Sequence, residues 1–285
     1  MSTAIVTDST ASIGGEHAVE NAISVVPLTV IVRGEPHDEG APGLLALMAE
    51  AMRAGETVTT SHPGPGAFLE RYQQLAQAGA DEIVSIHLSS QLSGACNSAR
   101  LAALDSPVRV RVVDSRSVAM GLGFPVLAAA EVAAAGGSAD EVAARAEEIA
   151  GGVAVWFFVD DLDVLRRGGR IGAARALWGN ALAIKPVLTI TGGEVAPFEK
   201  VRTTARAVAR LEDLAVERSV FEATQIAVHH VDALDRAVVL AARLRDRLPS
   251  TSVEVSELPA VIAAHSGPGT LAVVVAPVPS LVGHR

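Results

Sequence analysis

Short apolar segments alternate with helical segments through the first half of the chain, and each apolar segment ends in a turn rich in hydroxyl or carboxylate side chains. The clearest example is 82–99, where an apolar strand pattern to His87 runs into a serine-rich turn and then into a helical run of small residues. Alternating strands and helices predict a mostly parallel sheet sandwiched by helices. Ligands of such sheets bind beyond the carboxyl ends of the strands. The pattern therefore predicts an α/β fold with a polar site at that edge.

Hydrophobic periodicity predicts the other elements. Further strands are expected at 4–6, 25–32, 108–113, 153–159, 185–190, 225–229, 253–255 and 271–275. Helices are expected at 44–54, 67–78, 93–99, 118–134, 139–150, 160–167, 204–219 and 234–248. Pro27 places the second strand at a sheet edge or beside a bend, and 57–68 is expected to be a rigid, proline-containing loop.

Gly151 and Gly152 mark the expected boundary between two domains. A chain of 285 residues has room for two domains of ordinary size. Both halves show strand and helix patterns, so we expect an N-terminal α/β domain at 1–151 and a C-terminal α/β domain at 152–285.

Composition excludes several classes of function. The net charge is −9 and no basic run with interleaved aromatic residues occurs, which argues against nucleic-acid binding. No uninterrupted apolar stretch is long enough for membrane insertion, and the first residues lack a signal-peptide pattern, so a cytoplasmic protein is expected. Aromatic residues make up only 3% of the chain, which favours an aliphatic ligand over a flat ring.

Metal and nucleotide sites lack their usual patterns. His229 and His230 are adjacent on an expected strand and would face opposite ways, and no two histidines have helical ligand spacing. The single cysteine, Cys96, excludes a cysteine-rich metal site and an internal disulfide. No glycine-rich phosphate loop with its lysine is present. We therefore expect neither a metal nor a cofactor.

The serine-rich turn after His87 has two interpretations. A helix start exposes unpaired N–H groups and the positive end of the helix dipole, which together stabilise a bound anion. Serine at such a position is most often only a helix cap. Ser93 is the candidate anion contact, whereas Ser89 and Ser90 are closer to the capping interpretation.

A serine hydrolase acting on an acyl ester is an alternative function. Ser93, His265 and either Asp8 or Asp114 supply the residue types of a catalytic triad. The nucleophile elbow, with glycine two residues on each side of the serine, is missing. The residue types alone therefore do not establish a triad.

Seven blocks of sequence, in this order, resemble the DegV family. They are VTDSTAS at 6–12, TSHPGPGAF at 60–68, SIHLSSQLSG at 85–94, VDSRSVAMGLG at 113–123, DDLDVLRRGGRIG at 160–172, EKVRT at 199–203 and AHSGPGTLAVVV at 264–275. Their joint occurrence extends from the first strand to the last. The resemblance implies two α/β domains with a tunnel at their interface that encloses one long-chain fatty acid. It also implies a carrier without catalysis of its own, which presents the carboxylate to a separate ATP-dependent fatty-acid kinase subunit for phosphorylation to an acyl phosphate.

The resemblance also assigns roles to residues. Ser93 is similar to the serine that contacts the carboxylate, and Thr60 or Ser61 to its partner from the proline-rich loop. His265 and Arg202 resemble groups near the carboxylate that are needed when phosphate is handled. Arg170 is expected at the mouth or on the face that meets the kinase.

Two departures from the family pattern are visible. His62 stands where glutamine is expected, which would alter hydrogen bonding near the carboxylate. Ala95 and Cys96 replace threonine and tyrosine, which would change the room along the acyl path. A sensor of another small anion is a further, non-enzymatic alternative.

Overall fold

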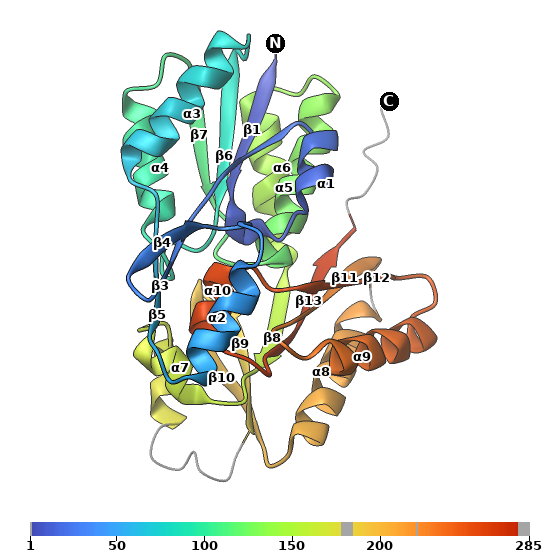
Figure 1. The fold of residues 1–285 in the computed structure, drawn as a ribbon. Helices are drawn as coiled ribbons and strands as arrows, with labels where there is room; N and C mark the ends of the chain where they lie inside the picture. Colours follow the sequence, from blue (N-terminus) through green and yellow to red (C-terminus); the bar gives the residue numbers. More distant parts are fainter. Residues whose placement is uncertain (1, 178–184, 221, 279–285) are drawn as a thin grey trace.

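The computed structural model describes residues 2–177, 185–220 and 222–278. Within these ranges the chain forms three β-sheets with helices packed around them (Figure 1). A parallel sheet occupies one end of the molecule and a mixed sheet the other, and a small antiparallel sheet lies beside the junction.

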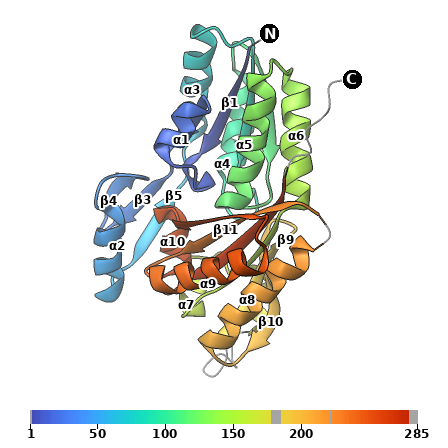
Figure 2. The same cartoon turned by 90° about the vertical axis from the view of Figure 1, so that its right-hand side faces the viewer.

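The first sheet is parallel throughout, with the order β2-β1-β6-β7. Its strands are β1 (Thr3–Asp8), β2 (Ile23–Val26), β6 (Glu82–His87) and β7 (Arg109–Asp114). Helices α3 and α4 cover one face, and α1, α5 and α6 cover the other (Figures 1 and 2). Their bounds are α1 Gly15–Glu20, α3 Pro65–Gln77, α4 Ala95–Leu104, α5 Met120–Ala134 and α6 Ala139–Gly152. The predicted parallel sheet between helices is confirmed.

The second sheet is mixed, with the order β10-β9-β8-β13-β11-β12. Only the pair β11 and β12 is parallel. The strands are β8 (Ala154–Phe158), β9 (Lys185–Thr191), β10 (Glu194–Val201), β11 (Thr224–His230), β12 (Ser252–Glu257) and β13 (Leu271–Pro277). One face packs on α8 (Thr204–Ser219) and α9 (Leu234–Arg247).

Helix α5 packs between the two large sheets. Leu122 and Val126 belong to the core of the first sheet, whereas Phe124 and Ala128 belong to a cluster with the second sheet. A helix that is apolar all round is buried on all sides, which explains why this segment is so rich in Ala, Leu and Gly. The two halves of the chain therefore share a core.

The third sheet, β4-β3-β5, is antiparallel and joins the N-terminal half to the C-terminal half. Its elements are β3 (Thr29–Val32), β4 (Glu35–Asp38) and β5 (Val58–Ser61), with α2 (Leu44–Arg53) between the last two. Its core includes Val30, Met48 and Val261, the last from α10 (Ala260–Ser266). Residues far apart in sequence thus form one cluster beside the junction.

Two predictions are corrected here. The single strand expected at 25–32 is two strands, because the chain leaves the first sheet at Pro27 and enters the third. The loop expected at 57–68 contains β5. Helix α10 and strand β4 were not predicted, although α10 carries His265.

Helix α6 ends at Gly152 and β8 begins at Ala154. The division into domains at 151 and 152 stays a prediction. In the described part of the chain, no helix combines the length and apolar character that a membrane crossing needs.

Candidate functional site

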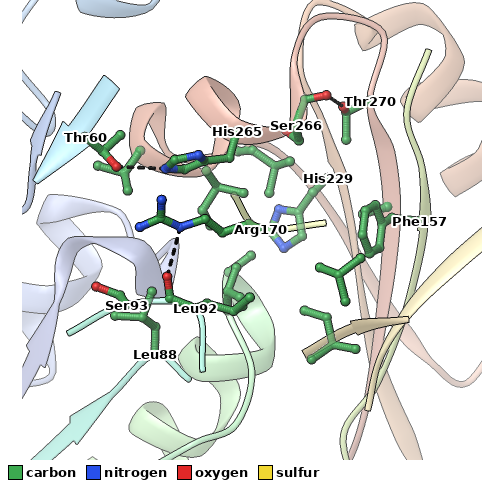
Figure 3. Close-up of a pocket in the computed structure, with 18 of the residues that line it drawn as sticks. Thr60, Leu88, Leu92, Ser93, Phe157, Arg170, His229, His265, Ser266 and Thr270 are labelled. Atoms are coloured by element: carbon green, nitrogen blue, oxygen red, sulfur yellow. Dashed lines mark hydrogen bonds between the residues drawn. The ribbon is translucent and has the colours of Figure 1, made fainter. Parts of the chain in front are cut away.

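A cavity of about 120 Å³ lies at the carboxyl edge of the first sheet, between that sheet, the second sheet and α10. Most of its wall is aliphatic. The apolar lining includes Leu28, Leu88, Leu92, Val155, Phe157, Leu165, Ile190, Val195, Val261, Ile262 and Val274. Figure 3 shows Phe157 and His229 at one end, and Thr60, Ser93, Arg170 and His265 gathered at the other. The cavity thus combines an apolar interior with one polar mouth.

The mouth is built from separate elements. Thr60 and Ser61 end β5, Ser93 precedes α4, Arg170 follows α7 (Leu162–Arg167) and His265 lies on α10. All five side chains line the cavity. Five of the six residues selected from the sequence therefore meet at one place.

Thr60 and His265 form the central contact of the mouth. The Thr60 hydroxyl and His265 Nε2 are 2.8 Å apart (Figure 3). Burial, and secondarily the positive charge of Arg170, lowers the pKa of His265 to about 4. The imidazole is therefore neutral near pH 7 and offers hydrogen bonding without charge.

Gly168 permits the close approach of α7 to His265. A Cβ at residue 168 would lie 2.4 Å from Nδ1 of His265. That nitrogen is buried, and no described residue is hydrogen-bonded to it. The ring is therefore held by packing against the Gly168 backbone and by its bond to Thr60.

Arg170 is the one permanently charged side chain among the described residues that line the cavity. Its Nε donates to the carbonyl of Leu92 at 3.2 Å and its Nη1 to the carbonyl of Gly168 at 2.6 Å. These bonds hold the guanidinium between the first sheet's edge and α7. Its remaining N–H groups can donate to an anion.

Ser93 lies one residue before the N-cap of α4 and faces the cavity. Its Oγ accepts the N–H of Ala95 at 3.3 Å, although the N-cap of α4 is Gly94, and the side chain also lines the cavity. Ser89 is buried and donates to the carbonyl of Gly193 at 2.7 Å, in the turn between β9 and β10. Ser90 is tied through its N–H to Asp114 at 3.3 Å.

A second, larger opening of about 770 Å³ adjoins the mouth; we call it the vestibule. Thr60, Arg170 and His265 line both spaces. Charged side chains from α2, α7, α9 and the segments between elements surround the vestibule, namely Arg53, Glu56, Asp160, Asp161, Arg167, Asp232 and Arg236. A group held at the mouth is thus within reach of a polar space outside the apolar cavity.

Arg202 lies apart from the other selected residues. It is exposed, follows β10 and precedes α8, and among the described residues it belongs to the lining of neither opening. Its assignment to phosphate handling stays a prediction.

His229 is a cavity residue that the sequence did not single out for binding. Its Nε2 accepts the N–H of Met120 at 3.3 Å, so its Nδ1 carries the proton and donates to Ser256 Oγ at 3.0 Å. Burial lowers its pKa to about 4. The sequence signal for His229 was the alternation of side chains along β11, which turns His229 and His230 to opposite faces of the sheet.

His62 also lines the mouth, next to Gly94. A Cβ at residue 94 would lie 2.5 Å from Nε2 of His62. The glycine before α4 therefore gives this imidazole room to lie against the start of the helix.

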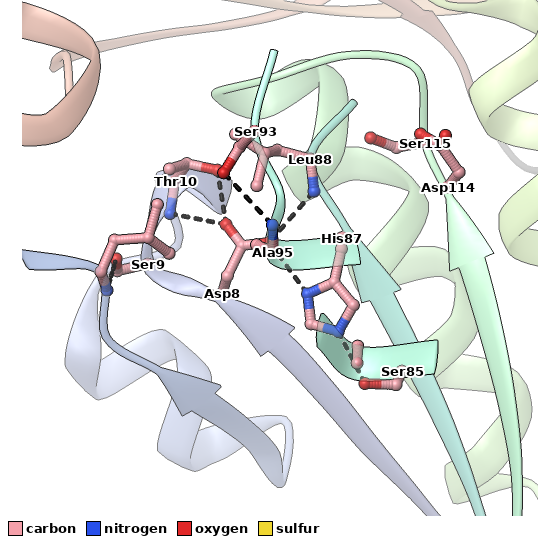
Figure 4. A network of polar contacts seen from close by, with 12 residues as sticks. Asp8, Ser9, Thr10, Ser85, His87, Leu88, Ser93, Ala95, Asp114 and Ser115 are labelled. Atoms are coloured by element: carbon pink, nitrogen blue, oxygen red, sulfur yellow. Dashed lines mark hydrogen bonds and ion pairs between the residues drawn. The ribbon is translucent and has the colours of Figure 1, made fainter. Parts of the chain in front are cut away.

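The hydrogen bonds of the described residues do not join Ser93, His265 and an aspartate into the triad of the alternative hydrolase function. Asp8 accepts hydrogen bonds from His87 Nδ1 at 2.9 Å and from the N–H of Leu88 at 3.0 Å. Figure 4 shows instead a chain from Asp8 through His87 to Ser85, with His87 Nε2 2.7 Å from Ser85 Oγ. All three side chains are fully buried, and the Tyr72 hydroxyl donates a hydrogen bond to Ser85 Oγ at 2.8 Å. An inaccessible serine cannot attack an ester, so this chain supports the core.

The part of the chain described by the structure contains no group of three or more His, Cys, Asp or Glu that could hold a metal ion. Burial raises the pKa of the Cys96 thiol to about 11. Cys96 is thus a protonated core residue.

Known proteins resemble this chain over nearly its full length. The family model described as "Uncharacterised protein, DegV family" matches residues 2–278. A DegV domain-containing protein of Streptomyces coelicolor is 52% identical over 273 residues, which cover 95% of this chain and 97% of that protein.

Two solved structures share the fold. A DegV family protein from Thermus thermophilus, described by its fatty acid binding, has a TM-score of 0.92 at 32% identity and covers 98% of this chain and 100% of its own. DegV from Bacillus subtilis, described as a fatty acid binding protein, has a TM-score of 0.90 at 33% identity, with the same coverage.

Proposed function

Because the chain belongs to the DegV family, we propose that it binds one long-chain fatty acid and presents the carboxylate to a separate ATP-dependent fatty-acid kinase subunit. The observation that carries the proposal is the cavity with an aliphatic interior and a single polar mouth. The fatty-acid binding described for the relatives from Thermus thermophilus and Bacillus subtilis supports the choice of ligand.

The apolar interior suits the acyl chain. Each methylene transferred from water is worth about 0.8 kcal/mol, so a chain of roughly fifteen contributes on the order of 12 kcal/mol before the costs of binding. Side chains such as Val155, Phe157 and Ile262 are proposed to supply this contact. The tail gives affinity, and the carboxylate gives orientation.

The mouth suits the carboxylate. A buried carboxylate needs a counter-charge and hydrogen bonds. Arg170 is proposed to supply the charge, while the hydroxyls of Thr60, Ser61 and Ser93 and the neutral ring of His265 supply hydrogen bonds. Near pH 7 His265 has no charge, so the neutralising charge falls to Arg170.

The phosphoryl donor is proposed to come with the kinase subunit, because the chain has no phosphate-binding loop of its own. The vestibule adjoins the mouth and gives a partner access to the carboxylate. Phosphorylation would place the new group beside Arg170, and Arg202 is proposed to face the partner.

Denaturing mass spectrometry of the purified protein tests the lipid. We expect release of one long-chain fatty acid per chain. Protein that is repeatedly empty and also fails to bind fatty acid in titration would contradict the proposal. A fluorophosphonate that labels Ser93 would instead favour the acyl-ester hydrolase.

Reconstitution with the kinase subunit tests presentation of the carboxylate. With ATP, kinase and fatty acid we expect an acyl phosphate, trapped as its hydroxamate, and none when the kinase is omitted. Arg202→Ala should keep fatty-acid binding and lose phosphorylation. Turnover equal to that of the natural protein would remove Arg202 from the partner-facing role.

A further inference from the structure

Helix α10 supplies one wall of the fatty-acid cavity. Val261, Ile262 and His265 all lie on it and line the cavity. It has only seven residues, too few to be stable without tertiary contacts. It packs against α2, β3 and β5 (Figure 1). What holds α10 in place therefore also shapes the cavity.

Glu39 holds the start of α10. Both carboxyl oxygens of Glu39 lie 3.2 Å from the N–H of Val261. The backbone of Glu39 is fixed in turn, because its N–H donates to the carbonyl of Leu28 at 2.9 Å. Leu28 is itself a lining residue. Glu39 thus connects two walls of the cavity.

The carboxyl group of Glu39 is poorly solvated. Burial raises its pKa to about 7, against the lowering effect of the N–H groups of Val261 and Ala260. The charge of Asp8, at the end of β1, raises the pKa further, and a hydrogen bond from Ser9 lowers it. His265, at the other end of α10, has its pKa near 4 and keeps one charge state over the range in which Glu39 titrates.

We propose that Glu39 is a positioning residue of the fatty-acid site, which keeps α10 against the cavity and couples ligand binding to the uptake of a proton. This inference rests on the proposed function. It adds a residue outside the cavity lining, and it adds a proton-coupled contact between that residue and one wall of the cavity.

The burial of Glu39 determines whether fatty-acid affinity rises or falls with pH. When ionised, Glu39 is stabilised by moving toward water, which releases the N–H groups of α10 and loosens the wall that carries Val261 and His265. When neutral, it stays in its partly buried position and α10 stays in place. A ligand that packs on α10 favours the buried form, so it binds more tightly on the acidic side of neutrality and takes up protons on binding.

Calorimetric titration with decanoate, a soluble fatty acid, tests the coupling. From about pH 6 to about pH 8.5 the Kd of the natural protein should rise by roughly three- to tenfold, since one pKa unit of coupling corresponds to tenfold in affinity. Glu39→Gln keeps the shape and the acceptor but does not titrate, so its Kd should rise clearly less over the same pH range. Glu35→Gln, on the exposed strand β4, is the matched control and should behave as the natural protein.

Proton uptake gives a second readout that loss of packing alone would not change. Titrations near neutral pH in buffers of different ionisation enthalpy should show proton uptake by the natural protein and none by Glu39→Gln. Equal pH slopes or equal uptake in the two proteins would overturn the role of Glu39 while leaving fatty-acid binding intact. Failure of the natural protein to bind any fatty acid at any pH would overturn both proposals.

Discussion

At the scale of single residues, the hydroxyl of Thr60 is expected to matter for binding rather than for folding. It meets His265 at 2.8 Å on the cavity side of β5. Thr60→Val keeps the shape and removes the hydroxyl, so fatty-acid affinity should fall by about five- to tenfold, the equivalent of one hydrogen bond of about 1 kcal/mol. Fluorescence titration measures the change.

The neighbouring Thr59 provides the control, because successive side chains of a strand point to opposite faces. Thr59 is exposed and lines the vestibule but not the cavity. Thr59→Val should bind fatty acid as the natural protein does. Equal losses in both variants would mean that the Thr60 hydroxyl has no specific role.

His229 and His265, two of the histidines that line the cavity, predict a loss of stability in acid. For both, burial lowers the pKa from 6.5 to about 4. Unfolded histidine takes up a proton near pH 6.5, so the stabilising effect is complete above that pH and is lost as pH falls through about 4. At 1.36 kcal/mol per pKa unit, each histidine contributes about 3 kcal/mol at most.

Urea unfolding of the ligand-free protein at several pH values measures this effect. Between about pH 6.5 and about pH 4 the natural protein should lose more stability than either His229→Gln or His265→Gln. Parallel pH profiles for the three proteins would contradict buried, neutral histidines.

The site was partly readable from single residues. Ser93 follows β6 in a polar turn, and such turns meet at the carboxyl edge of a parallel sheet; Thr60 in β5 and Arg170 after α7 come from outside that sheet. His229 was missed because a buried strand histidine gives no local sign that it faces a ligand. Asp8 is paired with His87, a contact between two parallel strands that spacing along the chain does not reveal.

At the scale of elements, the turn between β9 and β10 fastens the second sheet to the serine-rich turn. Gly193 has φ +90°, and a Cβ there would lie 2.5 Å from the Ser89 hydroxyl. Gly193→Ala should therefore cost about 2 to 4 kcal/mol, from the left-handed backbone and from loss of the Ser89 hydrogen bond. Chemical denaturation measures the change.

Gly192 separates the two causes. It has φ +61° but open space at the Cβ position, so Gly192→Ala should cost only the backbone strain of about 1 to 2 kcal/mol. Gly193→Ala should also weaken fatty-acid binding, because Ser89 lies in the turn that carries Leu92 and Ser93. Similar effects of the two changes would mean that the contact with Ser89 contributes little.

Elements with a regular pattern were predicted well, and those defined by tertiary contacts were not. Strand β6 and helices α5 and α9 carry long apolar or amphipathic patterns and were placed to within two residues. Strand β5 has prolines and glycines beyond its end that favour a loop, but pairing with β3 makes it a strand. Helix α10 is too short for a clear period and depends on Glu39 and on the cluster around Met48.

At the scale of the whole molecule, the two halves are coupled through a shared interior. Helix α5 belongs to the cores of both large sheets, and the third sheet packs on α10 from the C-terminal half. The proposed boundary at 151 and 152 divides the sequence but crosses this packing. Parallel strands, the βα order and the second α/β unit were readable from the sequence. The packing of 28–61 against α10 was not, because no local pattern encodes which distant surface an element covers.

This coupling predicts which segments of the chain a bound fatty acid protects from amide exchange. A ligand that binds only the folded state stabilises it by mass action, by about 2.7 kcal/mol at a concentration of one hundred times Kd. Because the cavity wall comes from β5, the turn at 88–93, α7 and α10, amide exchange should slow at all four together when oleate is added. The outer helix α1, which contributes nothing to the described lining, should slow only to the extent that global unfolding is suppressed.

Hydrogen exchange followed by mass spectrometry distinguishes this from binding to one half. Protection of 58–61 and 260–266 that rises with the same oleate dependence as that of 88–93 would show that one ligand closes both sides of the cavity. Protection limited to the N-terminal segments would place the ligand outside the cavity. In Arg170→Ala the same segments should respond, but at a higher oleate concentration, because the tail still packs on both halves while the carboxylate has lost its counter-charge.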